Sequence, residues 1–281
     1  MQNNELQALV SLISDEDREV VSHVETKILE LGSEIIPLLE AEWEKSLDPD
    51  VQLRIEQLIH LLQQQQLQER LLNWKKAGGQ DLLEGLWLVA TYQYPDLQFE
   101  TIKAQIEQLY YEVWLQLENE MHPLDQVKVV NSVIFGKLKF AANTTNFHSP
   151  ANSMINLVLD TKKGNPITLC AVYMLVAQKL KMPVYGVNLP NLFVLTYKKE
   201  HTQFYINAFS RGVILSKADI DNYISKLNLE PLDIFFEPCS HVDIIFRVLR
   251  NLVVSFTRNN EDDKVNEIKM LLDLLADDDT E

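Results

Sequence analysis

The sequence has little of what marks a secreted or a membrane-spanning protein. It contains two cysteines, Cys170 and Cys239, and no CxxC pair in 281 residues. Its longest charge-free apolar run, Ile167 to Ala177, is about half of the roughly 20 residues that a membrane-spanning helix needs. The opening residues lack the basic stretch of a secretory signal. We therefore expect a cytoplasmic protein that has no disulfide and does not cross a membrane.

Basic residues are also scarce. Lysine and arginine together number 25 against 41 aspartates and glutamates, which gives a formal net charge of −16. Binding to phosphate backbones or to anionic lipid needs clustered basic side chains. We therefore expect no nucleic-acid partner and no membrane partner. The acidic runs at Asp15 to Glu19, at Glu261 to Asp263 and in the C-terminal tail are interpreted as solvated helix caps and a frayed end.

Motifs of the common catalytic and metal sites are absent from the sequence. It has no glycine-rich phosphate loop, no His-Glu-x-x-His, no Gly-x-Ser-x-Gly and no EF-hand loop. The histidines do not have metal-ligand spacing; they are His23, His60, His122, His148, His201 and His241. We therefore expect no metal and no cofactor.

Apolar residues recur at helical spacing through the first quarter of the chain, between Leu6 and Leu67. The pattern predicts helices of about 12 to 18 residues and loosely resembles a HEAT-type helical repeat. A generic helical bundle fits it nearly as well. The break at Gly78 and Gly79 then suggests a helical N-terminal region over residues 1–76.

The rest of the chain predicts a core followed by a helix hairpin. An almost wholly apolar helix from Ile167 to about Leu180 is expected to be buried on all sides. Three β-like runs follow it, at Val184 to Leu189, Leu192 to Tyr197 and Gln203 to Phe209. The last two helical patterns form the hairpin. We assign residues 77–235 to the core and residues 236–281 to the hairpin with its acidic tail.

Several motifs occur in a recognisable order over residues 80–255. They are Phe140-Ala-Ala-Asn143, Pro150-Ala-Asn152-Ser153, Lys163-Gly164-Asn165-Pro166-Ile167, Pro183-Val-Tyr-Gly186-Val-Asn-Leu-Pro190 and Tyr205-Ile-Asn-Ala-Phe209. Together they resemble the SirB-type branch of the transglutaminase-like superfamily. The resemblance implies a papain-like core in which a buried helix packs on a small antiparallel sheet. The expected fold class is therefore α+β and mostly helical, which agrees with the periodicity.

The resemblance also implies that the catalytic triad of this superfamily is missing. Active members carry the nucleophilic cysteine in a Gly-x-Cys motif at the start of the buried helix, where the helix dipole favours the thiolate. Pro166 takes that position here, in Gly164-Asn165-Pro166. Leu192 takes the position of the histidine and Asn207 that of the aspartate. Proline and leucine can neither attack a substrate nor move a proton.

Other residues near these positions are the remaining candidates for chemistry or binding. Cys170 lies four residues after Pro166, on nearly the same helical face. Burial in an apolar helix raises the pKa of a thiol, so we interpret Cys170 as structural and keep it as an alternative nucleophile. The polar candidates for binding in the cleft are Asn165, Thr168, Asn191 and Asn207.

Three functions remain open at this point. The favoured one is a non-catalytic protein-interaction or scaffold module, whose partner is a protein or a peptide. The second is a cysteine-type hydrolase or acyltransferase with a relocated site at Cys170. The third is a peptide or small-ligand binder that uses the old cleft.

Overall fold

The computed structural model describes residues 3–276, so the end of the acidic tail, residues 277–281, lies outside them. The chain divides into two compact units, Met1–Asn73 and Trp74–Glu281. The boundary falls inside helix α4 (Pro49–Lys76). The domain limits expected from the sequence stay a prediction.

The first unit is a small helical assembly. It contains α1 (Asn3–Ser11), α2 (Arg18–Leu31), α3 (Ile36–Lys45) and most of α4, with single 3-10 turns η1 (Leu12–Ser14) and η2 (Ser33–Ile35) between them. Apolar residues at helical spacing form its core, among them Ile13, Ile28, Ile35, Leu39, Ile55 and Leu62. Asp17 caps α2, because its side chain accepts a hydrogen bond from the Glu19 amide. The HEAT-like repeat stays a prediction.

The second unit holds the remaining helices and all the strands of the described chain. Its helices are α5 (Leu82–Thr91), α6 (Phe99–Trp114), α7 (Pro123–Asn131), α8 (Ile155–Thr161), α9 (Pro166–Lys179), α10 (Lys217–Lys226), α11 (His241–Asn259) and α12 (Asp262–Leu275). A π-helical turn, η3 (Ser132–Lys137), continues α7, and short 3-10 turns lie at η4 (Pro150–Ser153), η5 (Ala208–Ser210) and η6 (Asp233–Phe235). The mostly helical α+β class expected from the sequence is confirmed.

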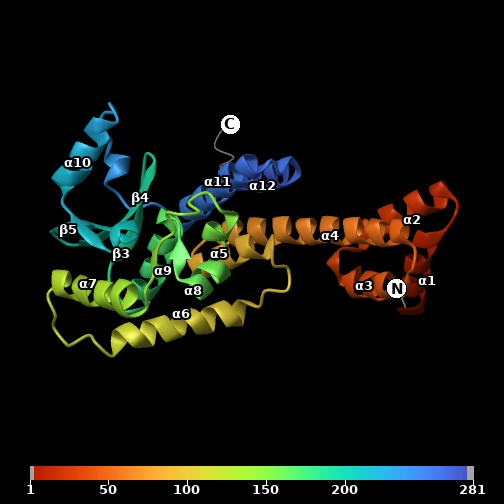
Figure 1. Cartoon of the computed structure of the whole chain (residues 1–281), viewed down its shortest axis with the longest axis horizontal. Helices are drawn as coiled ribbons and strands as arrows, with labels where there is room; N and C mark the ends of the chain where they lie inside the picture. The colour runs from red at the N-terminus through yellow and green to blue at the C-terminus, as the bar shows by residue number, and fades with distance from the viewer. Residues whose placement is uncertain (1–2, 277–281) are drawn as a thin grey trace. The chain divides into compact units, whose positions relative to one another are not determined.

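Four antiparallel strands form the main sheet, in the order β3 (Val184–Leu189), β4 (Leu192–Lys199), β5 (Thr202–Asn207) and β6 (Val213–Leu215). Side chains alternate between its two faces. Val187 and Val194 cluster with Ile220 of α10, which covers one face. On the other face, Gly186 lies against Phe193 and against Ile244 of α11. Helix α9 also contacts β3 and β4 (Figure 1).

Helix α9 is buried along most of its length, as its sequence predicts. Ten of its residues are buried, and Cys170 and Tyr173 have no exposed surface. Besides β6, which the sequence did not predict, the structure adds two shorter strands that the periodicity did not indicate. These are β1 (Ala141–Ala142) and β2 (Lys163–Gly164), which pair in parallel. Two-residue strands are too short to leave a periodic signal.

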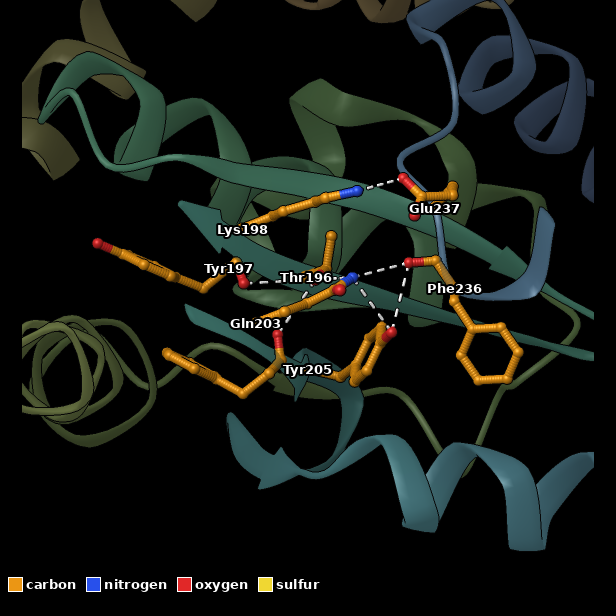
Figure 2. Close-up of polar contacts among 8 residues, drawn as sticks. Thr196, Tyr197, Lys198, Gln203, Tyr205, Phe236 and Glu237 are labelled. Carbon is orange, nitrogen blue, oxygen red and sulfur yellow. Dashed lines mark hydrogen bonds and ion pairs between the residues drawn. The ribbon is translucent and has the colours of Figure 1, made fainter. Parts of the chain in front are cut away.

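The segment between α10 and α11 is tied to three strands of the main sheet, β5, β4 and β3. The carbonyl oxygen of Phe236 accepts hydrogen bonds from the Gln203 side chain at 2.9 Å and from the Tyr205 hydroxyl at 3.3 Å (Figure 2). Lys198 pairs with Glu237 beside them. The Cys239 amide then donates to the carbonyl of Gly186 at 2.9 Å. These bonds fix the point at which α11 begins.

Within residues 3–276, no helix combines the length and the apolar character that crossing a bilayer requires.

Candidate functional site

The N-terminus of α9 is closed by its own side chains. Asn165 is the N-cap, and its side-chain oxygen accepts from the Thr168 amide at 3.0 Å. The Thr168 hydroxyl accepts from the Asn165 amide at 3.2 Å, which completes a capping box. Pro166 occupies the first helical turn, where a missing N–H costs nothing. The first position of the helix therefore carries no nucleophilic side chain, and the Thr168 hydroxyl is engaged in the cap.

A buried polar network continues from this cap into the loop before α8. The Asn165 side-chain amide donates to the Ser153 hydroxyl at 3.0 Å, and the Thr168 hydroxyl donates to the Asn152 carbonyl at 2.7 Å. Asn152 in turn donates to the carbonyls of Asn146 and Phe147. All the partners are neutral, so the network holds the loop against α9 without adding a charge.

A pocket of about 210 Å³ opens beside this helix start, and we call it the α9 pocket. Its polar lining consists of His148, Asn165, Asn191, Arg247, Asn251 and Ser255. Its apolar lining consists of Phe147, Pro166, Ile167, Phe193 and Val254. The pocket thus joins the loop before α8, the start of α9, the β3–β4 turn and α11.

The β3–β4 turn brings Asn191 to the pocket and turns Leu192 away from it. Pro190 and Asn191 connect the strands, and Asn191 has a left-handed φ of 56°, which asparagine tolerates better than most residues. The Tyr223 hydroxyl holds this turn by donating to the Pro190 carbonyl at 2.7 Å. Leu192 packs in the apolar cluster under α10, whereas Phe193 faces the pocket.

Helix α11 supplies a row of polar residues that the sequence did not single out. Arg247, Asn251 and Ser255 follow one another at intervals of four and so lie on one helical face. Their spacing is visible in the sequence as a polar row beside the buried apolar stripe. The pattern does not predict which element the row faces, because α11 meets α9 and η4 only through packing between segments far apart in the sequence.

Arg247 is half-buried and bonded only to neutral acceptors. Its Nη1 donates to the Asn188 side-chain oxygen at 2.6 Å and to the Leu189 carbonyl at 3.3 Å. Among the described residues, no carboxylate forms an ion pair with it. Burial, followed by the nearby charge of Arg250, lowers the pKa of its guanidinium. An arginine nevertheless stays protonated in proteins, so the lining of the pocket includes a positively charged residue.

Cys170 lies one turn below Pro166 but does not reach the pocket. The residue has no exposed surface, and its Sγ is 3.6 Å from the carbonyl oxygen of Phe193. Burial raises the pKa of the Cys170 thiol well above its usual value. The thiol is therefore held neutral, the opposite of an activated nucleophile.

Two of the four expected binding residues lie outside the lining of the α9 pocket. Thr168 is fully buried in the capping box. Asn207 ends β5, where its side chain accepts from the Ser210 amide at 3.1 Å and caps the turn η5. Asn165 and Asn191 are the two that the pocket brings together. Within residues 3–276, no group of acidic, histidine or cysteine side chains is arranged to hold a metal ion.

Comparison of the sequence with known proteins identifies a family to which the chain is similar. The sequence model of the transglutaminase-like superfamily matches residues 100–250, more than half of the chain. These residues include α9, the main sheet and Arg247, the first residue of the row on α11. No solved structure matches the chain.

The similar curated proteins come from bacteria and mammals. A UPF0162 protein of Xylella fastidiosa strain 9a5c is 28% identical over 193 residues, which cover 65% of this chain and 67% of that protein. The protein of the same name from strain Temecula1 is 29% identical, over 61% of this chain and 63% of its own length. F-box only protein 21 of Mus musculus is 26% identical over 57% of this chain and 31% of its own length.

The chain thus spans about two thirds or less of the length of these relatives, and their names assign no reaction to it. The match over residues 100–250 carries the assignment by itself. This chain belongs to the transglutaminase-like superfamily.

Proposed function

We propose that this protein is a non-catalytic member of its superfamily that binds a protein or peptide partner through the α9 pocket. The observation that carries the proposal is Pro166 at the first turn of α9, in place of a nucleophile, beside a pocket with polar lining. Asn165 and Asn191 present side-chain amides there, which bind by hydrogen bonds and do not react.

The similarity to F-box only protein 21 supports a module that works together with other protein segments. The match covers 31% of that protein, so a region of this kind occurs there within a much longer chain. The N-terminal helices form a compact unit of their own, and we propose this unit as a further surface for protein contacts.

A relocated enzyme is the alternative that the pocket must be tested against. His148 and Ser255 both line the α9 pocket and are residue types used in nucleophilic catalysis. The Ser255 hydroxyl, however, donates to the Asn251 carbonyl of its own helix at 2.9 Å. Among the described residues, no hydrogen bond joins His148 to Ser255 or to Cys170. An activated pair of nucleophile and base is therefore not formed.

The catalytic question is tested with the purified full chain, a glutamine-containing peptide and a primary amine. We expect neither amide hydrolysis nor amine incorporation above the level of a Cys170→Ala, Ser255→Ala double variant. Turnover by the wild type that the double variant lacks would refute the non-catalytic proposal.

Partner binding is tested by selecting peptides from a random display pool on the wild-type protein. The selected peptides are then measured against Asn251→Trp, which fills the α9 pocket at a half-buried position. The matched control is Asn222→Trp, an exposed position on α10. We expect Asn251→Trp to weaken binding by at least about tenfold and the control to leave it unchanged. Equal affinity of the peptides for both variants would mean that they bind outside the α9 pocket.

A further inference from the structure

The lining of the α9 pocket includes Arg247, a positively charged residue that the described protein does not neutralise. Both protein acceptors of Arg247 bond to its Nη1, so the described residues offer no acceptor to Nη2 or Nε. Residues 3–276 give it no acidic partner either. A partly desolvated cation of this kind favours an anion as its third partner, because its hydration is already reduced.

The surroundings of Arg247 decide on which side the anion binds. Arg247 also borders a second hollow, which Glu237 and Asp243 line. Glu237 is compensated by its ion pair with Lys198, whereas the Asp243 carboxylate is bonded only to Ser240 among the described residues and repels an anion on that side. The lining of the α9 pocket contains no acidic residue, so the attraction of the guanidinium is unopposed there at short range.

Two amide side chains in the pocket can donate further hydrogen bonds to an anion bound by Arg247. Asn191 and Asn251 line the same pocket, and neither has a side-chain hydrogen-bond partner among residues 3–276. Each offers an N–H₂ donor. The amide of Asn165 is already bonded to Ser153, so it shapes the wall and is not a free donor.

The volume and the apolar lining of the pocket limit the size and the chemistry of the group attached to the anion. A volume of about 210 Å³ is below the roughly 300 to 1,000 Å³ of pockets that enclose a whole small molecule. Phe147 and Val254, which are 43% and 48% exposed, flank the opening and offer an apolar surface. The pocket therefore suits one anionic group together with one apolar side chain.

A single guanidinium with neutral donors matches one negative charge better than two. A carboxylate fits the planar fork of arginine with two parallel hydrogen bonds. A phosphate dianion would bring a second charge to a protein whose net charge is already −16.

We infer that the α9 pocket recognises a carboxylate attached to an apolar group, as found at the C-terminus of a peptide, with Arg247 as its anchor. The inference rests on the proposed function of the pocket as a binding site and specifies its ligand. The same chemistry occurs in a free apolar carboxylic acid and in an internal aspartate or glutamate beside an apolar residue.

The test uses the full chain and three probes: N-acetylphenylalanine, its neutral amide, and inorganic phosphate. Binding is followed by NMR, from the shifts of the Arg247 Nε–H and of the Asn191 and Asn251 side-chain amides. An acid of about fifteen non-hydrogen atoms is expected to bind with a Kd on the order of 1 mM. The amide and phosphate are expected to bind at least about tenfold more weakly.

The variants isolate the charge of Arg247. Arg247→Gln is expected to lose at least about tenfold in affinity for the acid. Arg250→Gln is the matched control, because it removes the same charge from an exposed position on the same helix; its affinity is expected to equal that of the wild type. Arg247→Lys keeps the charge without the planar fork, and its affinity is expected to lie between those of the wild type and Arg247→Gln.

A last pair of probes separates the sources of the carboxylate. A short peptide ending in free phenylalanine is compared with the same peptide amidated at its end and carrying an internal aspartate beside phenylalanine. Tighter binding of the first assigns the pocket to a chain end, and tighter binding of the second overturns that assignment.

The carboxylate inference and the proposed function fail differently. Equal binding of N-acetylphenylalanine and its amide, no binding of the acid up to about 20 mM, or wild-type affinity in Arg247→Gln would overturn the carboxylate inference. These outcomes leave the non-catalytic proposal standing. If Arg247→Gln does not fold, the acid and amide comparison on the wild type and on Arg247→Lys decides the question. Turnover in the glutamine assay would overturn the proposed function, whatever the acid does.

Discussion

At the scale of single residues, hydrogen bonds among neutral side chains hold the start of α9. Thr168 has no exposed surface, and its hydroxyl serves the Asn165 amide and the Asn152 carbonyl at once. Removing this hydroxyl would leave two buried backbone groups without a partner, each of which costs about 1–3 kcal/mol. The cap is therefore a strong determinant of local stability.

We predict that Thr168→Val lowers the free energy of unfolding by about 2 kcal/mol, because valine has a similar shape but no hydroxyl. Urea denaturation measures the change. Thr101→Val is the control, since Thr101 is exposed in the first turn of α6, and it should alter stability by less than about 0.5 kcal/mol. Equal effects of the two changes would contradict the role given to the capping box.

At the scale of elements, the position of α11 depends on one glycine of the sheet. A Cβ atom on Gly186 would lie 2.7 Å from Cζ of Phe193 and 3.2 Å from Cδ1 of Ile244. Side chains do not tolerate such short contacts, so any larger residue must move the helix or the ring. Because α11 carries Arg247, this packing also sets the geometry of the α9 pocket.

We therefore predict that Gly186→Ala destabilises the protein by about 1–3 kcal/mol through overpacking. It should also weaken the binding of N-acetylphenylalanine. The control is Gly136→Ala in η3, where the added Cβ would meet no atom within 4 Å. That change should be neutral or stabilise by up to about 1 kcal/mol. A Gly186→Ala protein as stable as the wild type would show that the α11 packing adapts without cost.

At the scale of the whole molecule, buried groups that are neutral when folded make the protein sensitive to alkali. Burial raises the pKa of the Cys170 thiol, and it raises that of the Cys239 thiol to about 12. Above the unfolded thiol pKa of about 8.5, the unfolded chain loses protons that the folded chain keeps. The contribution of the neutral buried thiols to stability is therefore fully present below about pH 8.5. It is lost as the pH rises toward the pKa that the thiols have in the folded protein.

We predict that the free energy of unfolding falls between about pH 8.5 and pH 10, by up to about 1.4 kcal/mol per pH unit for each such group. In Cys170→Ala the fall over this range should be smaller by up to about 2 kcal/mol. Urea denaturation at both pH values tests this. Val172→Ala, a buried change on the same helix, should lower stability equally at both. An unchanged slope in Cys170→Ala would mean that its thiol ionises in the folded state.

The parts of this protein that depend on local periodicity and local caps were predictable from the sequence. The all-apolar run after Pro166 predicted a buried helix, and α9 has those limits to within a residue. Strand β3 has the predicted limits, and β4 extends two residues further. The predicted third strand was too long at its end, because Asn207 caps the turn η5 and so stops β5.

Which residues meet at the start of α9 depends on how distant elements pack together. Asn165 and Asn191 meet there, while the Thr168 side chain turns into the cap and Leu192 into the core under α10. Arg247 and Asn251 enter the same pocket from a helix more than 50 residues further along the chain. Periodicity fixes the face on which a side chain lies, but not the element that packs against that face. That second choice depends on long-range packing, such as the contact of Gly186 with α11, which no local pattern encodes.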